Sequence, residues 1–88
     1  MDVLFEASFA KDLKRVKDKQ LLKRVQNILE HVKVANSLSD ISNLKKLQGY
    51  DSYFRLRLGD YRIGIEVEGQ TVVFVRILHR KDIYQKFP

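Results

Sequence analysis

The stretch around Gly59-Asp60 constrains the fold most strongly, because apolar and basic side chains alternate on both sides of these two residues. Side chains on a strand point to alternate faces, so residues 53–65 predict a β-hairpin with an apolar face and a basic face carrying Arg55, Arg57 and Arg62. A two-residue loop sets Arg57 directly opposite Arg62, at a cost on the order of a few tenths of a kcal/mol or more. A face that only meets water gains nothing from this repulsion. The pattern therefore favours a face that holds an anion.

Composition narrows the class of protein. The 88 residues, 44% of them hydrophobic, predict one folded domain spanning residues 1–88. The net charge of +6 predicts a polyanionic partner, nucleic acid first; a basic surface with no partner is the alternative. The chain has no cysteine, which excludes disulfides and a thiolate nucleophile. It has no apolar run of about 18 residues and an acidic start, so we expect a cytoplasmic protein without membrane contact.

The first half of the chain predicts a strand and two helices. The strand covers Val3–Phe5. Helices run from about Phe9 to Lys17, capped by Ser8, and from about Lys19 to Ala35, capped by Asp18. Their apolar residues recur at helical spacing, so the helices form a hairpin with one buried stripe. A linker follows, and Leu44 and Leu47 attach the segment 44–49 to the core.

The second half predicts three strands, at about 52–58, 61–67 and 71–79, followed by one helical turn in residues 81–88. We favour a three-residue turn, Glu68–Gln70, which sets Arg62 opposite Arg76; a two-residue turn moves Arg76 to the other face. In the last strand, Val73, Val75 and Ile77 are expected to meet the helices. The predicted fold is α+β, in the order β-α-α-β-β-β. Its sheet is twisted and mostly antiparallel, with the helices on one face and arginines lining the concave other face.

Several basic side chains are candidates for binding phosphate, because the guanidinium group offers a fork of donors that matches it. Arg76 and Arg80 share parity and are expected to join the hairpin arginines. Lys45 and Lys46 extend this track or are merely solvated. Glu66 is expected to neutralise a neighbouring arginine. The alternative for the whole face is a solvated surface in which arginine stems cover apolar groups.

Two residues near the end of the chain are candidates for proton transfer. Tyr84 is a potential general acid or base, or else an aromatic that packs the tail. His79 is a second candidate, or else a packing or capping residue. Two scattered histidines without cysteine form no metal-ligand set, and no glycine-rich phosphate loop is present. We therefore predict no metal and no cofactor.

Four segments, taken in this order, resemble the RelE/ParE superfamily of toxins from type II toxin–antitoxin pairs: Ser8–Leu13, Leu47–Tyr50, Phe54–Ile63 and His79–Tyr84. The resemblance covers nearly the whole chain and implies a RelE-like fold. It also implies two alternative activities. RelE-like members cut mRNA in the ribosomal A site, whereas ParE-like members poison DNA gyrase and are not nucleases.

The resemblance to the RelE-like branch assigns roles to individual residues. Arg55 and Arg57 match a basic pair on the second strand, where the best-known members carry lysines. Arg62 and Arg80 match two arginines that stabilise the transition state, and Tyr84 matches the tyrosine of the C-terminal helix. His79 is the alternative base.

The implied reaction needs no metal. The ribose 2′-OH attacks the scissile phosphate, leaving a 2′,3′-cyclic phosphate and a 5′-OH. The implied partners are the ribosome with its mRNA, a helical and acidic antitoxin that wraps the toxin, and operator DNA bound through that antitoxin.

Overall fold

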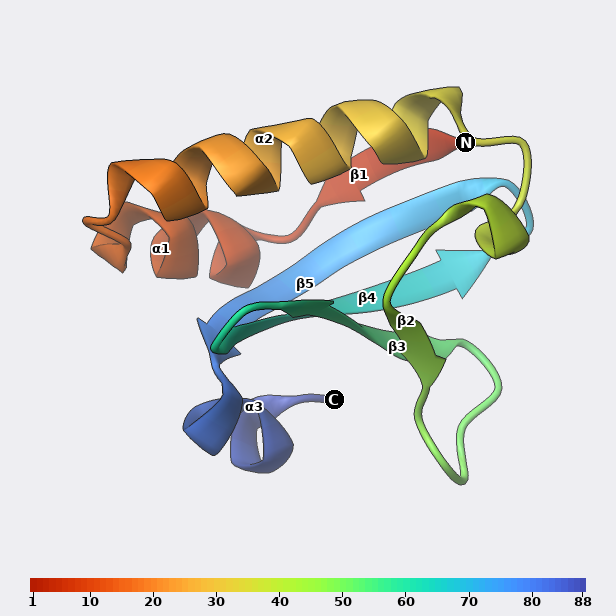
Figure 1. Cartoon of the computed structure of the whole chain (residues 1–88). Coiled ribbons are helices and arrows are strands. Elements are labelled where there is room, and N and C mark those ends of the chain that lie inside the picture. Colours follow the sequence, from red (N-terminus) through yellow and green to blue (C-terminus); the bar gives the residue numbers. More distant parts are fainter.

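The computed structural model describes all residues from 1 to 88, as a five-stranded sheet between two helical layers (Figure 1). The strands lie in the order β1-β5-β4-β3-β2; β1 runs parallel to β5, and the other pairs are antiparallel. This arrangement confirms the predicted α+β fold. The elements are β1 (Asp2–Phe5), α1 (Ala7–Arg15), α2 (Lys19–Val34), the 3-10 turn η1 (Leu38–Asp40), β2 (Leu44–Lys46), β3 (Tyr53–Leu58), β4 (Tyr61–Glu68), β5 (Thr71–His79) and α3 (Arg80–Lys86).

The helices α1 and α2 begin for different physical reasons. Asp18 caps α2 as predicted, since its carboxylate accepts from the amides of Gln20 at 2.9 Å and Leu21 at 3.2 Å. The predicted cap of α1 is wrong. That helix begins at Ala7 without a side-chain cap, and Ser8 lies inside it. The Ser8 hydroxyl instead donates to the carbonyl of Val75 in β5 at 2.6 Å, so it joins the helix to the sheet.

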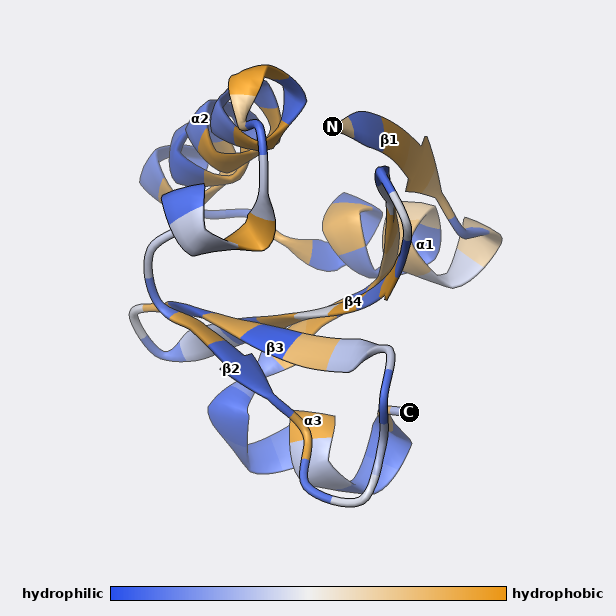
Figure 2. Ribbon diagram, turned by 90° about the vertical axis from the view of Figure 1, so that its right-hand side faces the viewer, coloured by the Kyte–Doolittle hydropathy of each residue, from blue (hydrophilic) through white to orange (hydrophobic).

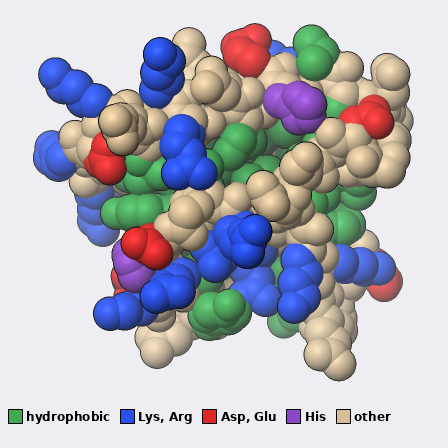
Figure 3. All heavy atoms as spheres, viewed as in Figure 1, with side chains coloured by type: hydrophobic (Ala, Val, Ile, Leu, Met, Phe, Trp, Pro, Cys, Tyr) green, Lys and Arg blue, Asp and Glu red, His purple; other side chains and the backbone are tan.

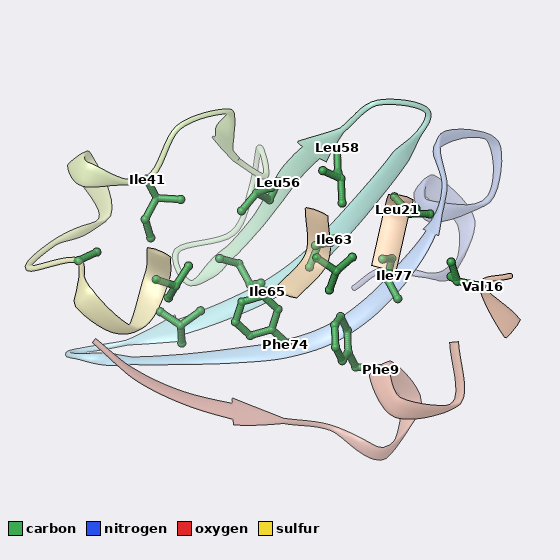
Figure 4. Close-up of a cluster of buried hydrophobic side chains, with 14 residues drawn as sticks. Phe9, Val16, Leu21, Ile41, Leu56, Leu58, Ile63, Ile65, Phe74 and Ile77 are labelled. Atoms are coloured by element: carbon green, nitrogen blue, oxygen red, sulfur yellow. The ribbon is translucent and has the colours of Figure 1, made fainter. Parts of the chain in front are cut away.

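The main core lies between the sheet and the layer formed by α1 and α2 (Figure 4). Ile63 and Ile65 of β4 and Val72 and Phe74 of β5 are fully buried there. They meet Phe9 of α1, whose ring contacts the Phe74 ring edge-on at a centroid distance of 5.5 Å. Burial of each such side chain contributes roughly 1.5–3 kcal/mol, so this core fixes the face that the sheet turns to the helices. No helix of the fold has the length and apolar content needed to cross a membrane.

The sequence predicted the turn of the first hairpin correctly and the turn of the second incorrectly. The first has the expected Gly59-Asp60 loop, with Leu58 opposite Tyr61 and Arg57 opposite Arg62. The expected three-residue second turn is wrong: Glu68 pairs with Thr71, and Gly69, with φ of +56°, begins a two-residue loop.

A β-bulge next to Gly64 and Ile65 then shifts the register, so that Arg76 pairs with Gly64 and Leu78 pairs with Arg62. Because the turn has two residues, Val72 and Phe74 meet the helices, whereas Val75 packs on the opposite face against the cluster of Leu47, Ile83 and Phe87. The prediction that Val73 and Val75 face the helices is therefore wrong.

Helix α1 completes the edge of β5 beyond the end of β1. The strand β1 pairs with β5 only up to Phe74, so the next backbone groups of β5 need other partners. The Asp12 carboxylate accepts from the Ile77 amide at 3.1 Å and binds Arg76 through two hydrogen bonds of 2.7 and 2.9 Å. The hydrogen bonds from Arg76 to Asp12 raise the pKa of Arg76 above its usual value. Asp12 is 5% exposed, so this ion pair is part of the structural framework.

The far face of the sheet carries a second, smaller core. The segment 80–86 forms a complete helix, α3, rather than a single turn, and it packs below the sheet in Figure 1. Ile83 of this helix and the following Phe87 are buried with Leu47. The segment 44–49 contributes the short strand β2, which the sequence did not predict and which pairs with β3 at the edge (Figure 2). The predicted arginine-lined concave face is thus partly covered by α3.

Replacing Asp12 by alanine is expected to lower the free energy of unfolding by about 3 kcal/mol, because Arg76 and the Ile77 amide lose their common partner. Glu30→Ala is the matched control. It removes an exposed pair with Lys33 at 3.5 Å and should change stability by no more than about 0.5 kcal/mol. Urea denaturation measures both. Equal effects of the two substitutions would contradict the structural role assigned to Asp12.

Candidate functional site

A basic hollow opens between β2, β3, β4 and α3. It has a volume of about 510 Å³ and is lined by Asn43, Leu44, Lys45, Arg55, Arg57, Arg62 and Tyr84. We refer to these seven residues as the basic hollow. Figure 3 shows Lys and Arg side chains gathered over the lower half of this face, below the layer of α1 and α2. Four of the seven lining side chains are cationic and none is acidic, so the hollow is built for negative charge.

Strand register brings the four cations of the hollow together. Lys45 of β2 lies opposite Arg55 of β3, and Arg57 of β3 lies opposite Arg62 of β4. Each pairing sets two positive charges directly across from one another, which is destabilising by itself. The ion pairs of the structure are Glu30–Lys33, Asp12–Arg76 and Asp60–Arg80, so none involves these four cations. Their charge is therefore available to a ligand.

Tyr84 reaches the hollow from α3. The guanidinium carbon of Arg55 lies 4.3 Å from the centroid of the Tyr84 ring, which is a cation–π contact. Tyr84 is 65% exposed, so its side chain covers Arg55 and remains open to solvent. This is the only candidate for proton transfer that the structure brings to the hollow.

The Gly59-Asp60 turn binds two arginines, Arg62 of the hollow and Arg80 of α3. Arg62 donates from Nη1 to the carbonyls of Gly59 at 2.7 Å and Tyr61 at 2.8 Å, which fixes its guanidinium beside the turn. The amide of Arg80 donates to the carbonyl of Asp60 at 2.7 Å, and the Arg80 Nε lies 4.0 Å from the Asp60 carboxylate. Arg80 therefore starts α3 at the same turn, although it does not line the hollow.

Three other sequence candidates lie outside the hollow. Lys46 follows Lys45 on β2 and pairs with Phe54, so it points away from the side of Lys45. Arg76 does not lie opposite Arg62 as predicted, and its guanidinium binds Asp12. His79 caps α3, with Nδ1 accepting from the Lys81 amide at 3.2 Å, and it lines a separate depression of about 210 Å³ beside Tyr61 and Asp82.

Sequence reasoning missed two residues of the hollow, Asn43 and Leu44, of which Leu44 was expected only in the core, and it misjudged Glu66. Asn43 has φ of +63°, and its carbonyl accepts from the Arg57 amide at 3.0 Å, which ties the linker to β3. An asparagine between Ser42 and Leu44 was the available signal, because asparagine tolerates this left-handed conformation. Glu66 lies opposite Tyr53 rather than an arginine, and its negative charge raises the pKa of the Tyr53 hydroxyl.

This arrangement can bind an anion, and it places one group capable of proton transfer, the Tyr84 phenol, beside that anion. Arg55 and Arg57 follow one side of β3, at a spacing of two residues, and present guanidinium donors along it. Arg62 is held at one end of the hollow by the turn, and Tyr84 lies over Arg55. A phosphate group between them meets several guanidinium donors and one phenol.

Comparisons with known proteins identify the family of this chain. A family model described as the ParE toxin of the type II toxin–antitoxin system parDE matches residues 3–84. Toxin RelE3 of Methanocaldococcus jannaschii is 51% identical over 89 residues, which cover 100% of both chains.

Solved structures give the same result. In the crystal structure of the RelB–RelE antitoxin–toxin complex from Methanococcus jannaschii, one chain is 48% identical, with a TM-score of 0.83 over 97% of this chain and 99% of that one. A chain of the RelBE2 toxin–antitoxin complex from Mycobacterium tuberculosis is 26% identical, with a TM-score of 0.66 over 92% of each chain. The fold alone is shared with a chain of the archaeal RelE–RelB complex of Pyrococcus horikoshii, which is 20% identical with a TM-score of 0.73 over 90% of this chain and 93% of that one. On the family match and the identity to RelE3, the chain belongs to the RelE/ParE superfamily of toxins from type II toxin–antitoxin systems.

Proposed function

We propose that this toxin is an endoribonuclease that cuts mRNA on the translating ribosome. The observation that carries the proposal is the set of four cations without carboxylate partners, with Tyr84 stacked on one of them. Two cross-strand pairs of like charge reduce the stability of the sheet, and a bound RNA backbone relieves that repulsion.

In the proposed reaction, the ribose 2′-oxygen forms a bond to the neighbouring phosphorus, and the bond from phosphorus to the 5′-oxygen breaks. Tyr84, in its deprotonated form, accepts the 2′ proton. Arg62 and Arg80 stabilise the additional negative charge on the phosphoryl oxygens, and such preorganised electrostatic stabilisation is usually the largest single contribution to catalysis. The reaction involves no change of oxidation state, and we propose that it needs no metal.

Arg55 and Arg57 hold the RNA backbone in this proposal. Their guanidinium groups bind phosphate oxygens, and a water molecule bound beside them protonates the leaving 5′-oxygen. Lys45, opposite Arg55, extends the contact along the strand edge. The products are one fragment that ends in a 2′,3′-cyclic phosphate and one that begins with a 5′-OH.

The ribosome supplies substrate alignment in this account. The hollow is open, and it has no aromatic sandwich or deep pocket that would fix a flexible single strand in the geometry of attack. Correct orientation of reacting groups is worth roughly 7–11 kcal/mol of a barrier. We therefore expect the isolated toxin to bind RNA weakly and to cut efficiently only when the message lies in the ribosomal A site.

The second partner that we propose is a cognate antitoxin. The relatives from M. jannaschii and M. tuberculosis, at 48% and 26% identity, were solved as complexes with antitoxins. An acidic, helical antitoxin segment suits the basic and apolar surfaces of this chain. Operator DNA would then be contacted through the antitoxin.

A gyrase poison is the alternative, and the match to the ParE family model favours it. That activity is protein binding and requires no proton-transfer group. The Tyr84–Arg55 contact and the unpaired cations favour the nuclease.

The basic hollow is expected to dominate binding of single-stranded RNA at low salt. Changing Lys45, Arg55 and Arg57 together to alanine should lower affinity and reduce the slope of log K against log salt by about 0.7 for each phosphate that the protein no longer neutralises. The control changes Lys11, Lys14 and Lys23 to alanine, which removes the same charge from the helices. Fluorescence anisotropy across a salt series measures both, and equal effects would show that only net charge matters.

Catalysis is tested in a cell-free translation system by primer extension on the message, with EDTA-treated toxin as one arm. We expect cuts inside the reading frame that need ribosomes and survive EDTA treatment. Arg62→Ala combined with Arg80→Ala should abolish the cuts while leaving the circular dichroism spectrum unchanged. A folded double variant with full activity would refute the assignment. An intact message would lead to a DNA supercoiling assay with gyrase.

Tyr84 and His79 are distinguished as bases by matched substitutions. Tyr84→Phe keeps the ring over Arg55 and removes only the hydroxyl, so cleavage should fall by about 10²–10⁴-fold. His79→Gln keeps a side chain that can cap α3 and should change cleavage by less than about tenfold. The reverse order of effects, measured by the rate of message cleavage on ribosomes, would assign the base to His79.

A further inference from the structure

We infer that Gly64 and Phe87 are positioning residues, which seat α3 on the sheet so that Tyr84 lies against Arg55. This inference deepens the proposed function and rests on it for its catalytic consequence. Neither residue lines the basic hollow, and neither carries a group that takes part in the reaction. Their effect on cleavage would pass entirely through the place that they give to α3.

Gly64 is glycine because of its contact with the Phe87 ring. Three other glycines, Gly49, Gly59 and Gly69, have positive φ angles, which favour glycine for backbone reasons; Gly64 does not. A Cβ atom added at Gly64 would lie 2.6 Å from Cγ and Cδ1 of Phe87 and 2.7 Å from Cδ2. These distances are far below the van der Waals contact of about 3.5 Å. The ring therefore rests directly on the backbone of β4, and any larger residue would push it away.

The same position in the sheet is next to Arg55. Gly64 is the direct cross-strand partner of Arg55, so the ring of Phe87 occupies the surface beside the Arg55 stem. Phe87 also contacts the Tyr53 ring edge-on at a centroid distance of 5.6 Å. Tyr53 and Arg55 point to the same side of β3, because they are two residues apart. Gly64, which is the seat of the Phe87 ring, and Arg55, which the Tyr84 ring contacts, are therefore neighbours on one surface.

Buried residues anchor α3 on the sheet, whereas the functional residue Tyr84 is exposed. Ile83 is fully buried and Phe87 is 4% exposed, and the amide of Phe87 donates to the carbonyl of Ile83 at 2.9 Å. Tyr84 follows Ile83 directly and is exposed. A helix of seven residues is too short to be stable without tertiary packing, so the Phe87 seat and the burial of Ile83 decide where Tyr84 lies. A misplacement of about 1 Å at a reacting group can cost about 10²-fold in rate.

The test introduces a methyl group under the ring and follows Tyr84 directly. In full-length protein that contains 3-fluorotyrosine, the ¹⁹F resonance of Tyr84 is assigned by Tyr84→Phe, and its position without the cation contact is given by Arg55→Ala. Gly64→Ala should move this resonance toward the Arg55→Ala position and should lower cleavage of a message on ribosomes by about 10²-fold. Phe87→Ala, which empties the seat without a clash, should act in the same direction if Gly64→Ala fails to fold.

Rescue separates positioning from a general loss of stability. Phe87→Leu provides room for the added methyl group, so the double variant Gly64→Ala with Phe87→Leu should recover cleavage by at least about tenfold over Gly64→Ala and shift the Tyr84 resonance back. Phe5→Ala, which removes an exposed aromatic ring from β1 at the opposite edge of the sheet, is the control and should leave the Tyr84 resonance in place.

Three results would overturn the inference: an unmoved Tyr84 resonance in Gly64→Ala, a moved resonance with unchanged cleavage, or a double variant no better than Gly64→Ala. If the wild-type toxin cuts no message, the proposed function fails. The ¹⁹F measurement then decides by itself whether the seat sets the contact between Tyr84 and Arg55.

Discussion

The tight turn at Gly59-Asp60 sets the geometry of everything on the basic side of the sheet. Gly59 takes a φ of +60°, which permits the two-residue loop and fixes the register that puts Arg57 opposite Arg62. The carbonyls of the same turn then bind the Arg62 guanidinium and the Arg80 amide. One turn thus aligns the repelling strands, holds one arginine in place and starts the helix that carries Tyr84. The buried core on the other side keeps the sheet intact against the repulsion.

Much of the fold was predictable because its elements have clear periods. Two patterns each specify one face to bury: the alternation in residues 53–65 and the helical spacing of Leu21, Val25 and Val32. The apolar face of the hairpin and the apolar face of α2 are both buried as expected. The second hairpin was not predictable in the same way. Loops of two and of three residues around Gly69 are both compatible with the local sequence, and we favoured the longer one; the bulge beside Gly64 then changes the register again. A one-residue error in the turn moves the side chains that follow it to the other face, which is how Val75 was misassigned.

The site was predictable where it depends on one hairpin and unpredictable where it depends on contacts far apart in the chain. Arg55, Arg57 and Arg62 share a surface because of local alternation. Arg76 is removed from that surface by Asp12, which lies 64 positions earlier and gives no local signal. Tyr84 reaches Arg55 because Ile83 and Phe87, four residues apart, anchor α3 on the far face. That spacing was visible in the sequence. The glycine that receives the Phe87 ring, Gly64, lies in β4, and only the fold brings the two residues together.

The chemical identity of the new fragment ends tests the central claim most directly. A message is cut on ribosomes by the purified toxin, and the 3′ ends of the upstream fragments are identified by mass spectrometry. Attack by the 2′-oxygen, as Tyr84 and the arginines are proposed to promote it, predicts a 2′,3′-cyclic phosphate, with a 5′-OH on the downstream fragment. Fragments with a 3′-OH and a 5′-phosphate would require attack by water from the other side of the phosphate. That result would contradict the proposed chemistry even if the toxin cuts RNA.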